Sequence, residues 1–154
     1  MRPRHVLPLA VLLAFPARLV AQESDTTMRS TRDGVYTEEQ AERGEALYTD
    51  VCLECHKPRE FARGSYLEEN WVGRTLVDLY WFLRDNMPED APGFLRPEEY
   101  VDAIAYILSS NRLPPGDSAL TTDETRLARI RIEKRERSTP SPSRPRDWWR
   151  HEER

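Results

Sequence analysis

The sequence predicts an all-α domain, and three observations support that fold class. Apolar residues recur at helical spacing in three segments between residues 35 and 116. Pro88 and the run Pro114-Pro115-Gly116 stand where two of these segments end. No segment alternates apolar and polar residues over a length that favours a sheet. The chain has 154 residues, which fits one domain with extensions.

Each predicted helix has its own start or stop signal. Residues 37–40 carry the capping-box pattern that opens the first helix. The second helix is expected over about 74–86, before Pro88, and the third over 97–110, with Pro97 at its first position. The apolar faces are, in order, Ala41, Gly44, Tyr48 and Val51; then Leu76, Leu79, Tyr80, Leu83 and Met87; then Tyr100, Val101, Ile104, Ala105, Ile107 and Leu108.

The N-terminal extension is typical of a secretory signal over residues 1–21. Basic residues precede a short apolar run over residues 6–15, and small residues follow up to Ala21. An uncleaved anchor is the alternative, but so short a run does not cross ~30 Å of hydrocarbon. We therefore expect export to the periplasm, followed by a flexible leader over residues 22–34.

The C-terminal extension differs in composition from the domain over residues 35–116. One more charged helix is expected within residues 117–137, and the alternative is a segment that frays in water. Residues 138–154 are rich in Ser, Pro and Arg, so we expect a disordered tail. Trp148 and Trp149 in this tail are candidate contacts for a membrane surface or a partner.

Charge separates the two parts of the chain. Residues 34–116 contain 8 basic and 16 acidic residues, a net charge of −8. Residues 117–154 contain 10 basic and 8 acidic residues, a net charge of +2. The negative sign of the domain disfavours nucleic-acid binding and favours partner proteins with a basic docking surface.

The motif that carries chemistry is Cys52-Leu53-Glu54-Cys55-His56. This C-x-x-C-H spacing is that of a c-type haem attachment site. The two thiols can add across the two vinyl groups of one haem, and the histidine that follows is then held beneath the iron. We expect Cys52 and Cys55 to bind the cofactor and His56 to bind its metal.

Three other interpretations of the cysteines remain at this point. They could close a disulfide, although so short a loop removes little chain entropy. They could form a thioredoxin-like dithiol, although no βαβ pattern surrounds them. They could bind zinc, with His151 as the remaining histidine to complete the site.

A second axial ligand is sought among the soft side chains of the exported chain. The candidates are Met28, Met87 and His151. Met87 ends an apolar helical stripe just before Pro88, whereas Met28 lies in the leader. We expect Met87 to bind the iron through its thioether, which raises the reduction potential relative to two histidines. The alternative is a methionine that only fills a gap in the core.

Three stretches together resemble one family: Cys52-x-x-Cys55-His56, then Asn86-Met87-Pro88, then the last helix from Glu98 to Asn111. They resemble a small single-haem class I cytochrome c over roughly residues 34–116. The resemblance is greatest to the cytochromes that accompany periplasmic quinoprotein dehydrogenases. It implies three main helices around one covalent haem, with a charged C-terminal extension, and no catalytic activity of the protein itself.

The resemblance also implies particular contacts. The first and last helices should cross closely, with Gly44 and Tyr48 against Tyr106. Trp71 matches a tryptophan that donates a hydrogen bond to a haem propionate in relatives, and an ordinary core tryptophan is the alternative.

The sequence departs from the family pattern in three ways. Only 31 positions separate His56 from Met87, which is short for the family and suggests a trimmed loop beneath the haem. Lys57-Pro58 follows the haem histidine where the family has glycine, which leaves the hydrogen-bond acceptor of the His56 ring open. Arg96 stands at the N-cap of the last helix, where Ser or Thr is the usual residue.

The function predicted from these residues is single-electron transfer by a periplasmic carrier with one covalent haem c. The alternative is a thiol–disulfide oxidoreductase that uses Cys52 and Cys55. A haem sensor that binds a gas after losing Met87 is a third possibility. The expected partners are a dehydrogenase, an oxidase or another electron-transfer complex.

Overall fold

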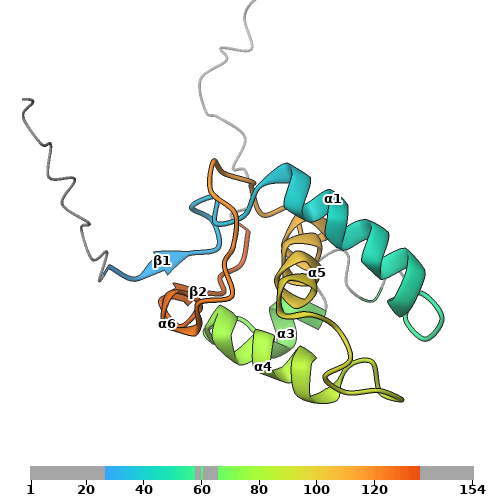
Figure 1. Ribbon diagram of the computed structural model, residues 1–154. Coiled ribbons are helices and arrows are strands. Elements are labelled where there is room, and N and C mark those ends of the chain that lie inside the picture. The colour runs from blue at the N-terminus through green and yellow to red at the C-terminus, as the bar shows by residue number, and fades with distance from the viewer. Residues whose placement is uncertain (1–26, 58–59, 61–65, 136–154) are drawn as a thin grey trace, which may run out of the picture.

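The computed structural model describes residues 27–57, 60 and 66–135 (Figure 1). The predicted signal and the predicted disordered tail lie outside these residues. Among the described residues no helix is both long and apolar enough to cross a membrane. The elements are β1 (Arg29–Ser30), α1 (Glu38–Leu47), the π-helical turn η1 (Tyr48–Cys52), α3 (Tyr66–Asn70), α4 (Leu76–Asn86), α5 (Pro97–Ser110), α6 (Glu124–Leu127) and β2 (Ile130–Arg131).

The described part of the chain is mostly helical, which confirms the predicted fold class. α1, α4 and α5 form where the sequence predicts helices. α1 begins at Thr37, whose hydroxyl accepts a hydrogen bond from the backbone N–H of Gln40. α4 begins at Thr75, whose backbone N–H donates to the carboxylate of Asp78 at 2.8 Å.

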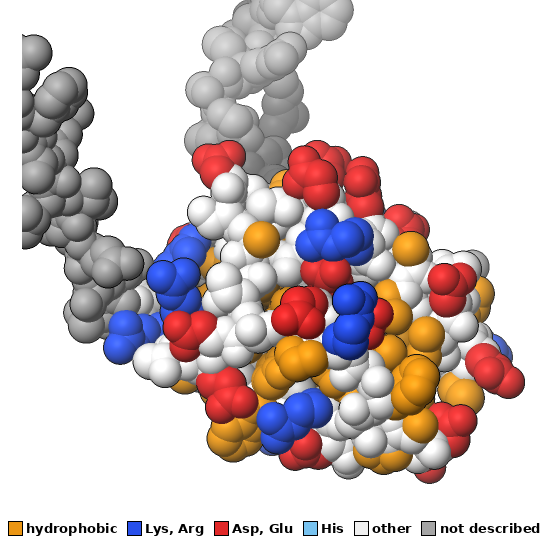
Figure 2. Space-filling view, in the orientation of Figure 1, with side chains coloured by type: hydrophobic (Ala, Val, Ile, Leu, Met, Phe, Trp, Pro, Cys, Tyr) orange, Lys and Arg blue, Asp and Glu red, His pale blue; other side chains and the backbone are white. Residues whose placement is uncertain are grey.

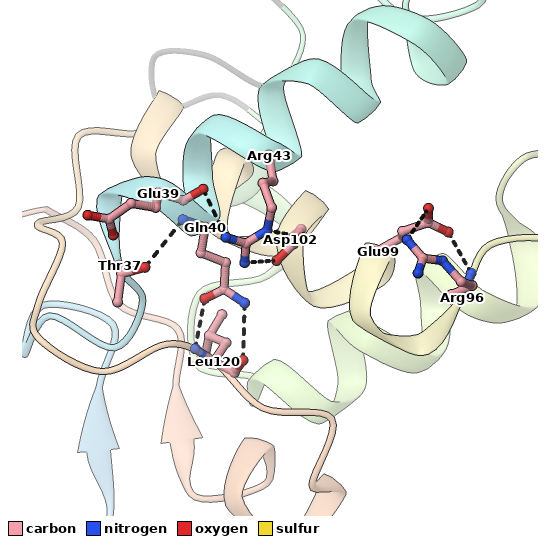
Figure 3. Close-up of polar contacts among 8 residues, drawn as sticks. All are labelled: Thr37, Glu39, Gln40, Arg43, Arg96, Glu99, Asp102 and Leu120. Carbon is pink, nitrogen blue, oxygen red and sulfur yellow. Dashed lines mark hydrogen bonds and ion pairs between the residues drawn. The ribbon is translucent and has the colours of Figure 1, made fainter.

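The start of α5 shows how Arg96 serves at an N-cap position. Its backbone N–H donates to the carboxylate of Glu99 at 2.8 Å, and its guanidinium pairs with the same carboxylate at 3.0 Å (Figure 3). The hydrogen bond from the Arg96 side chain lowers the pKa of Glu99. A charged pair therefore does at this position part of what a Ser or Thr cap does elsewhere.

α1 and α5 cross in close contact. A Cβ atom on Gly44 would lie 2.0 Å from the carbonyl oxygen of Asp102, so only glycine fits. The rings of Tyr48 and Tyr106 pack with their centroids 5.1 Å apart. Arg43 donates two hydrogen bonds to the Asp102 carboxylate, at 2.9 and 3.0 Å (Figure 3). These contacts agree with the crossing that the resemblance implies.

The core lies between α1, α4 and α5. Its fully buried members include Tyr36, Leu76, Tyr100, Ile104, Leu108, Leu127 and Ile132. Two of these, Leu127 and Ile132, come from residues 117–135, which we call the strap. The strap thus contributes to the same apolar core as the helices.

The strap differs from the charged helix expected over residues 117–137. α6 has only four residues, and the chain then becomes extended at β2. The reason is visible in residues 130–133, where Ile130 and Ile132 are buried and alternate with Arg131 and Glu133. Such alternation has the period of a strand and is too short to notice in a charged segment.

The leader expected over residues 22–34 also differs, in its described part. β1 and β2 pair in parallel, with Arg29 opposite Ile130 and Ser30 opposite Arg131. Thr31 is fully buried, and its backbone N–H donates to the Arg131 carbonyl at 3.0 Å. Residues 29–31 are therefore held by hydrogen bonds to the strap, across about a hundred positions of sequence.

Gln40 joins the strap to α1. Its side-chain amide donates to the Leu120 carbonyl at 3.0 Å and accepts from the Leu120 N–H at 2.8 Å (Figure 3). The amide is buried, with the residue 2% exposed. These two hydrogen bonds satisfy the backbone N–H and carbonyl of Leu120, which lies in no helix or strand.

Candidate haem site

The C-x-x-C-H motif forms one compact turn directly after α1. η1 carries the chain to Cys52, and the Leu53 N–H donates to the Tyr48 carbonyl at 2.9 Å, five residues earlier. The N–H groups of Cys55 and His56 then both donate to the Cys52 carbonyl, at 3.2 and 2.9 Å. Two thiols and one imidazole therefore come from a single turn.

Tyr48 holds this turn against the helices. Its hydroxyl donates to the His56 carbonyl at 2.7 Å, while its ring packs on Tyr106 of α5. The position of His56 is thus linked to the crossing of α1 and α5. The sequence singled out Tyr48 only as a crossing residue, and its hydrogen bond to the motif is a finding of the structure.

Both cysteines are free thiols. Cys55 is exposed and Cys52 is partly buried. Burial raises the pKa of the Cys52 thiol above its ordinary value. A thiol nucleophile in disulfide exchange needs a lowered pKa, so the environment of Cys52 does not favour that chemistry.

The His56 ring has a carboxylate neighbour that the sequence analysis did not single out. Its Nδ1 lies 3.3 Å from Oε2 of Glu60, at i,i+4 spacing. A histidine that binds a metal usually gives its other ring N–H to a carboxylate or a carbonyl. The i,i+4 spacing of His56 and Glu60 is the signal by which this pair could have been found.

Met87 lies on a separate element, at the C-cap of α4. Its N–H donates to the Leu83 carbonyl at 2.8 Å, and its own carbonyl accepts from the Tyr100 hydroxyl at 3.1 Å. Tyr100 is buried in α5 and packs edge-on against Tyr80. The backbone at Met87 is therefore fixed by both helices, while the residue remains partly exposed.

Trp71 carries an unsatisfied polar group that bears on the cofactor. Among the described residues, its indole Nε1 is the buried side-chain nitrogen or oxygen that has no hydrogen-bond partner. The ring is 4% exposed and packs edge-on against Phe82. A buried N–H without an acceptor costs free energy, and a haem propionate is an acceptor of the required kind.

The residues present fit a covalently bound haem. The described part of the chain offers two free thiols and an imidazole in one turn, a thioether on a backbone fixed by two helices, and an indole N–H that lacks an acceptor. It contains no cluster of three or more His, Cys, Asp and Glu side chains that could hold a metal ion. His151, the further ligand considered for zinc, lies outside the described residues.

A comparison with protein families connects this arrangement to the c-type cytochromes. The family whose model matches is cytochrome c oxidase, cbb3-type, subunit III, over residues 39–107. That match includes the C-x-x-C-H turn, α4, Met87 and most of α5, and it ends before the strap. It supports a c-type cytochrome with a haem c cofactor and a role in electron transfer. No match was found among curated proteins or among solved structures.

Proposed function

We propose that this protein is a periplasmic carrier of single electrons with one covalent haem c, bound by His56 and Met87. The observation that carries the proposal is the turn at the end of α1, which holds two free thiols and a histidine at C-x-x-C-H spacing. The family match over residues 39–107 supports the haem and the electron-transfer role.

Each residue has a distinct part in holding the group. Cys52 and Cys55 form the thioethers, and the His56 imidazole is the axial ligand on the same turn. When bound, the haem supplies an iron that alternates between the ferrous and ferric states. Tyr48 fixes the backbone of His56, and Trp71 offers its N–H to a propionate.

Met87 is the second ligand in this proposal, for a reason of placement. The C-terminal ends of α1 and α4 lie on the same side of the molecule in Figure 1. Met28 directly precedes β1, on the opposite side in that view, and is 50% exposed. This placement favours the thioether of Met87 as the second ligand.

The partner of this carrier is proposed to present a basic surface. Exposed acidic residues follow both ligands along the chain: Glu60 after His56, then Glu89 and Asp90 after Met87. Complementary charge speeds the encounter of transient electron-transfer partners more than it tightens their complex. Salt screens such attraction, so the transfer rate is expected to fall as ionic strength rises.

The alternative function is thiol–disulfide exchange by Cys52 and Cys55. The observation in its favour is that both thiols are free and that Cys55 is exposed. The raised pKa of Cys52 and the helical surroundings oppose it. The two functions differ in one measurable property, which is the mass of the chain.

The experiment is mass spectrometry of acid-extracted protein made in cells with an intact cytochrome c maturation system. We expect the polypeptide mass plus one haem, recovered from the periplasmic fraction without residues 1–21. A Cys52→Ala/Cys55→Ala variant should lose the haem, and Thr49→Ala, at an exposed position just before the motif, should retain it. A parent chain at its bare polypeptide mass would contradict the proposal and leave the dithiol function.

A further inference from the structure

The strap end of the molecule is basic, in contrast to the rest of the described chain. Residues 34–116 carry a net charge of −8. Residues 129–135, by contrast, contain four basic residues and one acidic residue. Figure 2 shows Lys and Arg side chains among a few acidic ones at the edge of the molecule where β1 lies. The charge difference between the two parts of the sequence is thus also a difference between two ends of the fold.

Pairing of β1 with β2 gathers basic side chains around a shallow hollow of about 300 Å³. Arg32, Arg131 and Lys134 line it. Two acidic partners lie nearby, because Arg32 pairs with Glu133 and Lys134 lies 3.6 Å from Glu68. Arg131 donates a hydrogen bond to the backbone carbonyl of Gly73 at 2.7 Å, and the partner in this bond is uncharged.

Further basic residues border the hollow and leave the surface positive. Arg74 is adjacent, because its carbonyl accepts from the Ile132 N–H at 2.8 Å. Arg135 follows Lys134 and is exposed. We call the surface formed by Arg32, Arg74, Arg131, Lys134 and Arg135 the basic face. Its five positive charges exceed the four negative charges beside it, on Asp33, Glu68, Asp78 and Glu133.

Exposed apolar side chains accompany these charges. Val72 lines the same hollow and is 39% exposed. Met28, just before β1, is 50% exposed. A positive surface with apolar side chains among the charges is typical of proteins that lie on anionic bilayers, where cations meet headgroups and apolar groups enter the interface. An acidic protein surface would pair with the basic side chains but would leave the exposed apolar side chains without a partner.

We propose that the basic face binds the anionic headgroup surface of a lipid bilayer. In that orientation the C-terminal ends of α1 and α4, which carry the motif and Met87, lie at the opposite side of the molecule (Figure 1). The site would thus stay open to a second protein while the strap contacts lipid. This proposal does not depend on the haem, since the strap and β1 contain none of its ligands.

The experiment is flotation of the purified exported protein with phosphatidylcholine vesicles, made with and without phosphatidylglycerol. We expect binding only to the vesicles with phosphatidylglycerol, and its loss at high salt. Arg131→Gln/Lys134→Gln should weaken this binding by roughly tenfold or more. Arg96→Gln/Arg112→Gln is the matched control, because it removes two exposed charges outside the basic face.

Two further samples separate the basic face from other causes. A chain that ends at Arg135 lacks the tail with Trp148 and Trp149, and its binding should still depend on Arg131 and Lys134. If Arg131→Gln impairs folding by circular dichroism, Lys134→Gln/Arg135→Gln replaces it, with the same expected loss.

Four results would overturn the proposal. They are equal binding to both kinds of vesicle, undiminished binding by a folded basic-face variant, equal weakening by the control variant, and capture by polyglutamate without any binding to vesicles.

Discussion

The two ends of this molecule are held together by different means. The strap end is held by contacts within the protein. Ile132 is fully buried, and Gln40 forms hydrogen bonds with both backbone groups of Leu120. At the end with the C-x-x-C-H turn, Cys52 and Cys55 are free thiols. The turn end therefore has reactive groups that a covalent cofactor would use.

The comparison indicates that stability and function depend on different ends of the molecule. The strap end gains its stability from buried apolar surface and paired backbone groups, which need no cofactor. The turn end is joined to the buried tyrosines by side-chain hydrogen bonds, from Tyr48 to His56 and from Tyr100 to Met87. We therefore expect the strap to be folded whether or not haem is attached, and the turn end to be firm only when it is.

Gly44 lies where α1 crosses α5, so a side chain there should disturb the packing at both ends of the molecule. Gly44→Val would place its Cβ 2.0 Å from the Asp102 carbonyl and force α1 and α5 apart. We expect a loss of about 3 kcal/mol or more in the free energy of unfolding. Urea denaturation measures it, and Ala46→Val, at an exposed position of α1, is the control. Equal stability of the two variants would contradict the close crossing.

Gln40 tests the strap end alone. Gln40→Leu would leave the N–H and the carbonyl of Leu120 buried and unpaired, for a loss of about 2 kcal/mol. The absorption spectrum of the haem should stay unchanged, because no proposed ligand contacts the strap. Glu42→Leu, on the exposed side of α1, is the control for urea denaturation. A change in the haem spectrum of a folded Gln40→Leu variant would show that the two ends are coupled.

Met87 tests the turn end alone. Met87→Ala should abolish the iron–sulfur charge-transfer band of the oxidised protein, open the iron to cyanide, and lower the reduction potential. Its free energy of unfolding should change less than that of Gln40→Leu, because Met87 is partly exposed. Met28→Ala is the matched control. If the band survives in Met87→Ala, the second ligand is another group.

Acid should weaken the strap end through Glu133. A hydrogen bond from the Ser30 hydroxyl, and then the Arg32 guanidinium, lower the pKa of Glu133 below its ordinary 4.5. A lowered folded-state pKa contributes stability that is present above pH 4.5 and is lost as pH falls toward the lowered value. We expect a small fall in stability over that window, less in Glu133→Gln than in the parent. Identical acid profiles would contradict this role.

The helices and the motif could be predicted because their signals are local. Thr37, Pro88 and Pro97 mark helix ends by rules that act over one turn. The thiols and His56 are adjacent in sequence, so their chemistry needs no knowledge of the fold. The crossing at Gly44 followed from the family resemblance, and the structure supplies its physical reason in the contact with Asp102.

The strap could not be predicted, because its determinants are distant in sequence. β1 and β2 pair across about a hundred residues, through strands of two residues each. In the sequence, Gln40 is only a residue of the capping-box pattern. Its pairing with Leu120 becomes visible only in the folded chain. The signal peptide, the ligation by Met87 and the periplasmic location remain predictions, which the experiments above address.

The π-helical turn η1 places one extra residue in the chain just before the C-x-x-C-H motif. In an α-helix each residue turns the chain by about 100°, and the five-residue hydrogen bond from Leu53 to Tyr48 adds one residue to that count. A π-helical turn takes up that extra residue within one wider turn, so the residues after it keep nearly the rotational phase of an α-helix with one residue fewer. The motif can therefore keep its side of the helix, although the segment from Tyr48 to Cys52 holds one residue more than an α-helical turn would.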